Sequence, residues 1–333
     1  MQYHNSRQEV TGLVVNKKVN IKREYRHNVR AMVHHLFTKG HFLVPTYCQN
    51  SNGDYFLEMK QGKLDQLQGK LGFIDGIDLY NMELSNDSNK PQIKSKETIY
   101  RRFLFYKEFY TAPKPVLICE GWTDYVYIEN ALRQLASNYP SLISLDSNKK
   151  VTFAIKRFKY SRSHTNDILG IKGGVGDFKN FIPAYKSEFD RFSTPGMKEP
   201  VILLVDNDKA GRDVLGVIKN MTKKDNKKRI DDQEPYIHIY RNLYLILTPP
   251  QNGKTESQIE DLFDDSTLGI KINGKSFNRL DEKTTETTYG KAVFAKEVVE
   301  KMASSINFEG FNALLDRIVK VIQAHYAQRV DKN

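Results

Sequence analysis

The sequence predicts an α/β protein built around a parallel β-sheet with flanking helices, preceded by a small basic α+β segment and followed by a helical C-terminal extension. Two observations predict the sheet. The apolar runs PVLIC (115–119) and VILLV (201–205) have the length of buried strands, and each is followed by a polar turn and a helical pattern. This repeated order is typical of a parallel sheet covered on both faces. The excess of Lys and Arg within residues 1–45 distinguishes the N-terminal segment.

The N-terminal segment begins with short apolar runs separated by polar turns. Residues 10–15 (VTGLVV) are a short β-type run. Over 22–37, apolar residues recur at three- and four-residue steps, which predicts a helix, and Gly40 is its expected C-cap. Residues 41–85 show no pattern that assigns them to helix or strand.

A polar linker is expected at 85–97, and a basic, aromatic helix at 98–110. The sheet region follows, with strands expected at 115–119, 151–155, 167–171, 201–205 and 243–247. Helices are expected to begin near residue 124, at the glycine-rich residues 173–176 and near residue 209. Two amphipathic helices are expected near 291–303 and 308–327.

Residues 269–276 (GIKINGKS) match the pattern of a phosphate-binding loop, G-x-x-x-x-G-K-[ST]. Such a loop needs a buried strand before it and a helix after it, whereas polar and acidic residues flank this one. Apolar residues on either side of Asn273-Gly274 favour a hairpin with a tight turn instead.

Composition excludes several classes of protein. Two cysteines in 333 residues, without a C-x-x-C motif, build neither a disulfide scaffold nor a zinc ribbon. No apolar stretch is long enough for a membrane span, and the first residues lack the apolar core of a signal peptide, so we expect a cytoplasmic protein without a membrane partner. The absence of G-x-S-x-G gives no support to serine-hydrolase chemistry.

The formal net charge of +11 favours a polyanionic partner, because each phosphate that a basic side chain neutralises releases counterions. The alternative is a basic surface that only faces solvent. The candidate nucleic-acid-binding residues are those of the basic N-terminal segment: Lys17, Lys18, Lys22, Arg23, Arg26 and Arg30.

Two acidic clusters, EGWTD (120–124) and DNDKAG (206–211), each follow the carboxyl end of an expected parallel strand. Ligands of open α/β sheets bind at this edge. Carboxylates gathered there repel one another unless a hard cation neutralises them, which predicts Mg²⁺, with Mn²⁺ as the alternative. A second interpretation is that the acids cap the following helices. A third group, Glu260-Asp261, either completes the site or forms the acidic face of a helix.

Residues 113–265 resemble the Toprim domain, whose pattern is a Glu after one strand, a Gly-rich turn, here Gly173-Gly174, and D-x-D after a later strand. The resemblance implies a Toprim-type sheet in which Glu120 is the general acid/base and Asp206 and Asp208 are the principal Mg²⁺ ligands. Asp124 would support them. Counting every acid that the resemblance brings to the site, the metal-ligand candidates are Glu120, Asp124, Asp206, Asp208, Glu260 and Asp261.

Lys291 is a further catalytic candidate, since a cation could stabilise the charge of a phosphodiester transition state. The alternative is an ordinary exposed lysine at the start of a helix.

Residues 10–30 resemble the thumb of retron reverse transcriptases, which carries a VTG triplet, and 67–78 are similar to the end of that thumb. The polymerase motif Y-x-D-D is absent, so the chain looks like a C-terminal part, or a separately made piece, of such an enzyme fused to a Toprim effector. The expected domains are a thumb-like segment, a linker with its helix, the Toprim domain, and a hairpin with C-terminal helices, at 1–84, 85–112, 113–265 and 266–333.

The two resemblances imply a Mg²⁺-dependent nuclease of a retron anti-phage system, with RNA such as tRNA favoured over DNA as the target. Its expected partners are the retron RNA, the reverse-transcribed DNA and the missing polymerase region, and a second copy of the chain is another candidate. Chain length and the lack of zinc-binding cysteines exclude the topoisomerase, primase and recombination-mediator activities of the Toprim family. The alternative function is a non-catalytic module that binds nucleic acid and assembles with the polymerase.

Overall fold

The computed structural model describes residues 8–16, 18–84, 95–148, 150–159, 164–224, 234–251, 253–279 and 285–330. The chain divides into two compact units. Unit 1 consists of Met1–Tyr110 and Tyr185–Gly196, and unit 2 of Thr111–Ala184 and Met197–Asn333. The C-terminal helices therefore belong to the same unit as the sheet, and the helix expected at 98–110 belongs to unit 1. Part of the linker expected at 85–97 lies outside the described residues.

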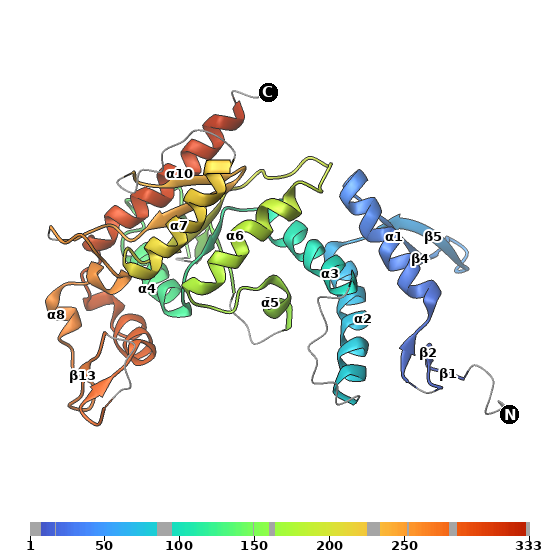
Figure 1. Cartoon of the computed structure of the whole chain (residues 1–333), viewed down its shortest axis with the longest axis horizontal. Helices are drawn as coiled ribbons and strands as arrows, with labels where there is room; N and C mark the ends of the chain where they lie inside the picture. Colours follow the sequence, from blue (N-terminus) through green and yellow to red (C-terminus); the bar gives the residue numbers. More distant parts are fainter. Residues whose placement is uncertain are drawn as a thin grey trace. The chain divides into compact units, whose positions relative to one another are not determined.

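Unit 1 combines small antiparallel sheets with helices (Figure 1). Its elements are β1 (Glu9–Val10), β2 (Leu13–Val14), β3 (Asn20–Ile21), α1 (Arg23–Lys39), β4 (Leu43–Gln49), β5 (Tyr55–Gln61), α2 (Leu64–Leu84), α3 (Ser95–Phe105) and the π-helical turn η1 (Tyr106–Tyr110). The predicted helices at 22–37 and 98–110 are confirmed. The unassigned stretch 41–85 contains the β4–β5 hairpin and α2.

Helix α1 forms because its apolar residues share one face. Val29, Val33 and Leu36 are buried at four- and three-residue steps. The helix ends at Gly40, whose φ of 80° is left-handed and whose N–H donates to the carbonyl of Leu36 over 2.9 Å. The C-cap expected from the sequence is thus confirmed.

Unit 2 is an α/β unit around a five-stranded sheet. The first part contains β6 (Val116–Ile118), α4 (Trp122–Gln134), β7 (Ile143–Leu145), β8 (Val151–Phe153), β9 (Lys156–Arg157), α5 (His164–Leu169), α6 (Val175–Phe189), β10 (Val201–Val205) and α7 (Lys209–Lys224). The second part contains β11 (Ile237–Tyr240), β12 (Leu243–Leu247), η2 (Ile259–Leu262), α8 (Asp265–Leu268), β13 (Ser276–Phe277), β14 (Thr288–Tyr289), α9 (Lys291–Val293), η3 (Phe294–Glu300), η4 (Ala303–Ser305), η5 (Glu309–Phe311) and α10 (Asn312–Val330). The five residues of α6 from Tyr185 onward belong to unit 1.

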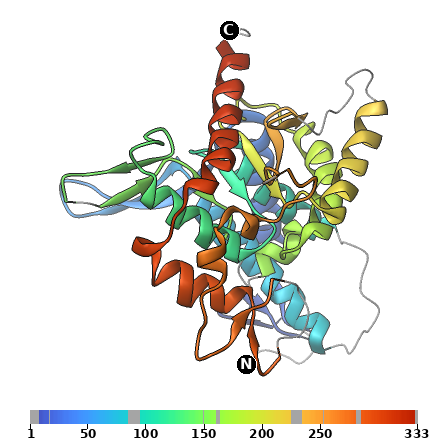
Figure 2. The same ribbon diagram turned by 90° about the vertical axis from the view of Figure 1, so that its left-hand side faces the viewer.

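The strand order of the large sheet is β11-β12-β10-β6-β9. Strands β12, β10, β6 and β9 are parallel, and β11 runs antiparallel beside β12. The prediction of a mostly parallel sheet with flanking helices is therefore confirmed. Figure 2 shows α4 and α10 on one side of the sheet and α6 and α7 on the other.

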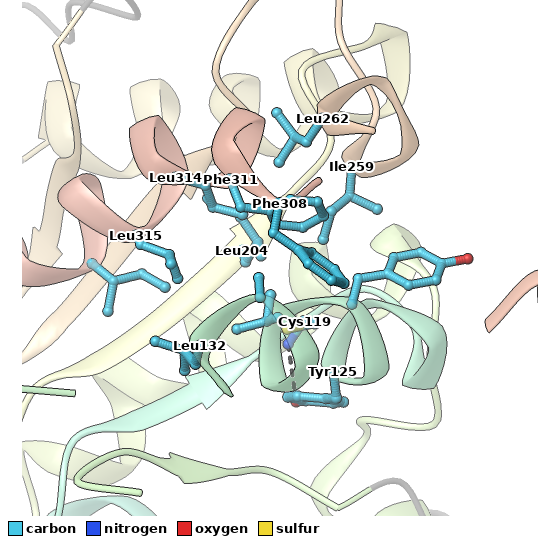
Figure 3. Packing of buried hydrophobic residues seen from close by; sticks show 14 of the residues in the cluster. Cys119, Tyr125, Leu132, Leu204, Ile259, Leu262, Phe308, Phe311, Leu314 and Leu315 are labelled. Carbon is cyan, nitrogen blue, oxygen red and sulfur yellow. Dashed lines mark hydrogen bonds between the residues drawn. The ribbon is translucent and has the colours of Figure 1, made fainter. Parts of the chain in front are cut away.

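Alternation along β10 gives each face of the sheet its own core. Ile202 and Leu204 belong to the apolar cluster formed with α4, η3 and α10. Figure 3 shows this cluster around Leu204, with Phe311 and Leu314 on one side and Leu132 on the other. Because all five residues of β10 are buried, the strand is covered on both faces, as its unbroken apolar run predicts.

The strand expected at 167–171 is wrong. His164–Leu169 forms α5, and its residues Ile168 and Leu169 are buried as part of a helix. Gly170 ends the helix with a φ of +72°. A short apolar run before a glycine fits a helical turn as well as a strand, so the pattern alone could not separate the two.

The hairpin predicted at residues 269–276 is confirmed. Ile272 and Lys275 form an antiparallel bridge, with each N–H donating to the other's carbonyl over 3.0 Å. Asn273 and Gly274 have φ angles of 50° and 77°, the left-handed pair that a tight hairpin turn requires.

Among the described residues, none of the helices is both long and apolar enough for a bilayer span.

Candidate active site

The carboxyl ends of β6 and β10 bring Glu120 and Asp206 to one edge of the sheet. The two strands are parallel neighbours, and Ile118 pairs with Leu203. Glu120 is two residues beyond Ile118, the last residue of β6, and Asp206 directly follows Val205, the last residue of β10. The two acidic clusters of the sequence thus lie side by side at the edge where open α/β sheets bind ligands.

Hydrogen bonds hold one oxygen of the Asp206 carboxylate. Its Oδ1 accepts from the Thr248 hydroxyl over 3.1 Å and from the N–H of Ile259 over 2.9 Å. Thr248 follows β12, the other neighbour of β10. The sequence analysis missed Thr248, although its place directly after an apolar run equivalent to VILLV was a usable signal.

Glu260 lies in the same group of carboxylates. Its side chain is 0% exposed, and neither carboxylate oxygen has a hydrogen-bond partner among the described residues. The ammonium of Lys291, the first residue of α9, lies 3.3 Å from Glu260 Oε1. Lys291 does start a helix, but its side chain is only 23% exposed and pairs with a buried acid, so the alternative of an ordinary exposed lysine is wrong.

The capping interpretation of the acidic clusters holds for two residues. Asp124 accepts from the N–H of Gly121 over 2.8 Å at the start of α4. Asp208 accepts from the N–H of Gly211 over 3.0 Å at the start of α7. Other carboxylates also repel Asp124, since the negative charges of Glu260 and Glu120 raise its pKa.

Asp261 has a different environment from its neighbour Glu260. It accepts from the N–H of Gln258 over 2.8 Å and pairs with Arg279, while Lys254 lies 3.5 Å away. Burial raises the pKa of Asp261, but these hydrogen bonds and cations together hold it below its usual value. The structure thus assigns Asp261 partners of its own, and we leave it out of the site proposed below.

The four acids Glu120, Asp124, Asp206 and Glu260 form the carboxylate cluster, a name kept below. Burial raises the pKa of all four, and repulsion from other carboxylates adds to the effect at Glu120, Asp124 and Asp206. The pKa of Asp124 rises to about 7 and that of Asp206 to about 8. The charge of Lys291 opposes the rise at every member of the cluster.

A glycine loop fixes the backbone of Glu120. The N–H of Gly174 donates to the Glu120 carbonyl over 2.9 Å. Gly173 and Gly174 have φ angles of +117° and +97°, which side-chain-bearing residues rarely adopt. Backbone hydrogen bonds from Asp206 and Val175 also reach the Glu120 side chain and oppose the rise in its pKa. The Gly-rich turn singled out in the sequence therefore positions Glu120.

The carboxylate cluster fits a divalent cation by its chemistry. All of its donors are oxygens and its members repel one another. Glu260 pairs with Lys291, but neither of its oxygens has a hydrogen bond of good geometry within the described residues. As they stand, no three His, Cys, Asp or Glu side chains within the described ranges are arranged to hold a metal ion.

Gly211 lets α7 start close to the end of β10. A Cβ atom at this position would overlap the carbonyl oxygen of Asp206. We expect Gly211→Ala to lower the free energy of unfolding by about 1–3 kcal/mol, because the helix must move away from the strand. Urea denaturation measures the change. The matched control is Gly216→Ala in the same helix, where a Cβ meets nothing, and it should add up to about 1 kcal/mol of stability. Equal effects of the two substitutions would contradict the close approach.

The carboxylate cluster should make stability depend on pH. Burial and neighbouring carboxylates raise the pKa of Asp206 to about 8 in the folded protein, above its value in the unfolded chain. Between these two pKa values the folded state binds more protons than the unfolded state, so the folded protein loses stability as the pH rises. Asp206→Asn removes the titrating group and keeps an acceptor for Ile259. Without divalent ions, the variant should therefore gain stability relative to the wild type between about pH 5 and about pH 8.

Urea denaturation of both proteins across this pH range provides the test. The difference between the two curves is the informative quantity, since burial lowers the pKa of His325 and this residue acts in the opposite direction in both proteins. A difference that stays constant with pH would contradict the raised pKa of Asp206.

The candidate nucleic-acid-binding residues of unit 1 divide into paired and exposed side chains. Arg26 makes two hydrogen bonds to Asp78, of 2.8 and 3.0 Å, and Lys22 pairs with Glu9. Lys18, Arg23 and Arg30 are exposed, and Lys17 lies outside the described residues.

Arg23, His27, Arg30 and His34 recur at four- and three-residue steps, and all four are exposed. They therefore form one basic stripe along α1. Such a stripe is the expected footprint of a phosphate backbone.

No protein-family model matches this chain, and no solved structure matches it.

Proposed function

We propose that this chain is a Mg²⁺-dependent nuclease whose active site is the carboxylate cluster with Lys291. The observation that carries the proposal is the burial of Glu260 beside the acids of two strand ends, with a single lysine among them. Acids and a cation gathered at the carboxyl edge of a parallel sheet are suited to catalysis on a phosphate group.

Each residue would have a distinct role. Asp206, Glu260 and Asp208 would hold the cation, which would supply Lewis-acid stabilisation of the phosphate charge when bound. Glu120 is suited to proton transfer because its raised pKa leaves a proton available closer to neutral pH. Lys291 would stabilise negative charge on the phosphate, and Asp124 would keep the start of α4 in place through Gly121.

The resemblance to Toprim and retron thumb sequences supports a wider proposal. The chain would be the effector part of a retron anti-phage system, with RNA such as tRNA favoured over DNA as its target. In unit 1, the basic stripe on α1 would bind the retron RNA or its reverse-transcribed DNA.

The experiment incubates the purified protein with labelled total RNA and with plasmid DNA, in Mg²⁺ and in EDTA. The proposal predicts cleavage of one of them that requires the ion. If the protein binds RNA in a salt-sensitive manner but cleaves neither substrate, the nuclease proposal is wrong for this chain.

A second candidate is the non-catalytic module that binds nucleic acid. The basic stripe of α1 favours it, because this surface needs no catalytic cluster to bind phosphates. Replacing Arg23 and Arg30 together by Ala should weaken RNA binding and its salt dependence under either candidate, so only the cleavage assay separates them.

A further inference from the structure

Trp122 is an exposed aromatic residue that is close in sequence to Glu120 and Asp124 of the carboxylate cluster. It is the first residue of α4 and follows Glu120 by two positions. Its side chain is 43% exposed, whereas Thr123 and Tyr125, its neighbours on the helix, are buried. An exposed indole offers solvent a large aromatic face and a polar N–H.

A lysine accompanies the indole ring. The ammonium of Lys296, an exposed residue of η3, lies 5.7 Å from the centroid of the Trp122 ring. Both elements are held by the core. Phe294 of η3 packs its ring 5.9 Å from that of Tyr127 on α4, and Ala295, Val298 and Val299 are fully buried. The core therefore holds the backbone from which both members of the Trp122–Lys296 pair extend.

Both members of this pair are close in sequence to residues of the proposed active site. Trp122 is joined to Glu120 through Gly121, and Lys296 follows Lys291, whose ammonium faces Glu260, along the same stretch of chain. A chain of several nucleotides is therefore long enough to contact both the pair and the carboxylate cluster.

We propose that Trp122 is a stacking platform for an unpaired base of the substrate and that Lys296 binds the phosphate of the same nucleotide. The inference rests on the proposed nuclease function and names its substrate class as single-stranded or locally unpaired nucleic acid. A nucleotide combines an aromatic face with a negative charge, and the pair offers an indole face with a positive charge. A base within a duplex has both faces covered by its neighbours, so it must leave the stack before it contacts the indole.

The chain itself supplies the probe, because Trp122 is its only tryptophan. Emission excited selectively from tryptophan therefore reports on this position alone. Glu120→Gln protein in Mg²⁺ is titrated with end-labelled oligonucleotides about 12 nucleotides long, single-stranded or duplex, of RNA or DNA. The anisotropy of the label measures binding, and the tryptophan emission measures contact with the ring.

The proposal predicts a change in tryptophan emission on binding of the single strands and a much smaller one with the duplexes. In the Glu120→Gln background, Trp122→Ala should weaken single-strand binding about 10- to 100-fold, while Trp122→Phe retains most of it. Tyr326→Ala, which removes another partly exposed aromatic ring of the same unit, should leave it unchanged.

Two results would overturn the stacking proposal alone: binding by anisotropy with constant tryptophan emission, and wild-type affinity of Trp122→Ala for single strands. Failure to bind any of the oligonucleotides would overturn the proposed function as well. A response to only RNA or only DNA supports the proposal and identifies the sugar that the site accepts.

Discussion

Glu120→Gln is expected to lower kcat for nucleic-acid cleavage by about 10²- to 10⁴-fold while the protein stays folded. The substitution keeps the size of the side chain but removes its capacity to exchange a proton. Its fold should survive because the main-chain contact with Gly174 and the apolar strand β6 are untouched. Single-turnover cleavage of the labelled substrate measures the rate, and circular dichroism and urea denaturation measure the fold.

Glu129→Gln is the matched control. Glu129 lies on α4, and its carboxylate pairs with Arg157 over 2.7 Å. The same chemical change at this position should leave kcat within about twofold. Glu129 is not part of the proposed active site, and a surface ion pair contributes little to the free energy of unfolding. If Glu120→Gln retained full activity, the assignment of Glu120 would be wrong.

Lys291→Met is expected to damage both stability and catalysis. Loss of its charge leaves the fully buried Glu260 without the ammonium now 3.3 Å away, which should cost about 3 kcal/mol at neutral pH. Without the charge of Lys291 beside the phosphate, kcat should fall by about 10²- to 10³-fold. Urea denaturation and single-turnover cleavage measure the two effects separately.

Adding Glu260→Gln to Lys291→Met distinguishes the two roles. Because the uncompensated charge is then removed, the double variant should regain most of the stability but none of the activity. If stability were not regained, the Lys291–Glu260 pair would not be the source of the loss. If Lys291→Met kept wild-type activity, Lys291 would have no catalytic part.

The sequence predicted best those elements whose pattern of apolar residues is compatible with only one type of secondary structure. A run of five buried apolar residues such as VILLV reads as a strand covered on both faces, and the regular steps of α1 read as a helix. The stretch that resisted prediction, 41–85, contains a hairpin whose strand β5 is exposed along its whole length. Its apolar residues therefore carry no alternation between core and solvent.

For the site, the sequence predicted which acids follow the strand ends, but it did not predict which side chains contact one another. Glu120 and Asp206 could be placed at one edge because each follows a strand of the same parallel sheet. Nothing in the order of residues indicates that Arg26 is held by Asp78, or that Glu260 is buried while Asp261 is bound by Arg279. Such contacts join segments far apart in sequence and depend on the completed fold.

Titration of the purified protein with Mn²⁺, followed by the loss of the signal of the free ion in electron paramagnetic resonance, tests the central claim most directly. The account predicts a saturable site in the wild type that Mg²⁺ competes for, and that Asp206→Asn weakens strongly. Asp213→Asn, which alters an acid on α7 paired with Lys179 over 2.7 Å, should bind like the wild type. The absence of saturable binding, or equal binding by Asp206→Asn and the wild type, would contradict a divalent-cation site in the carboxylate cluster.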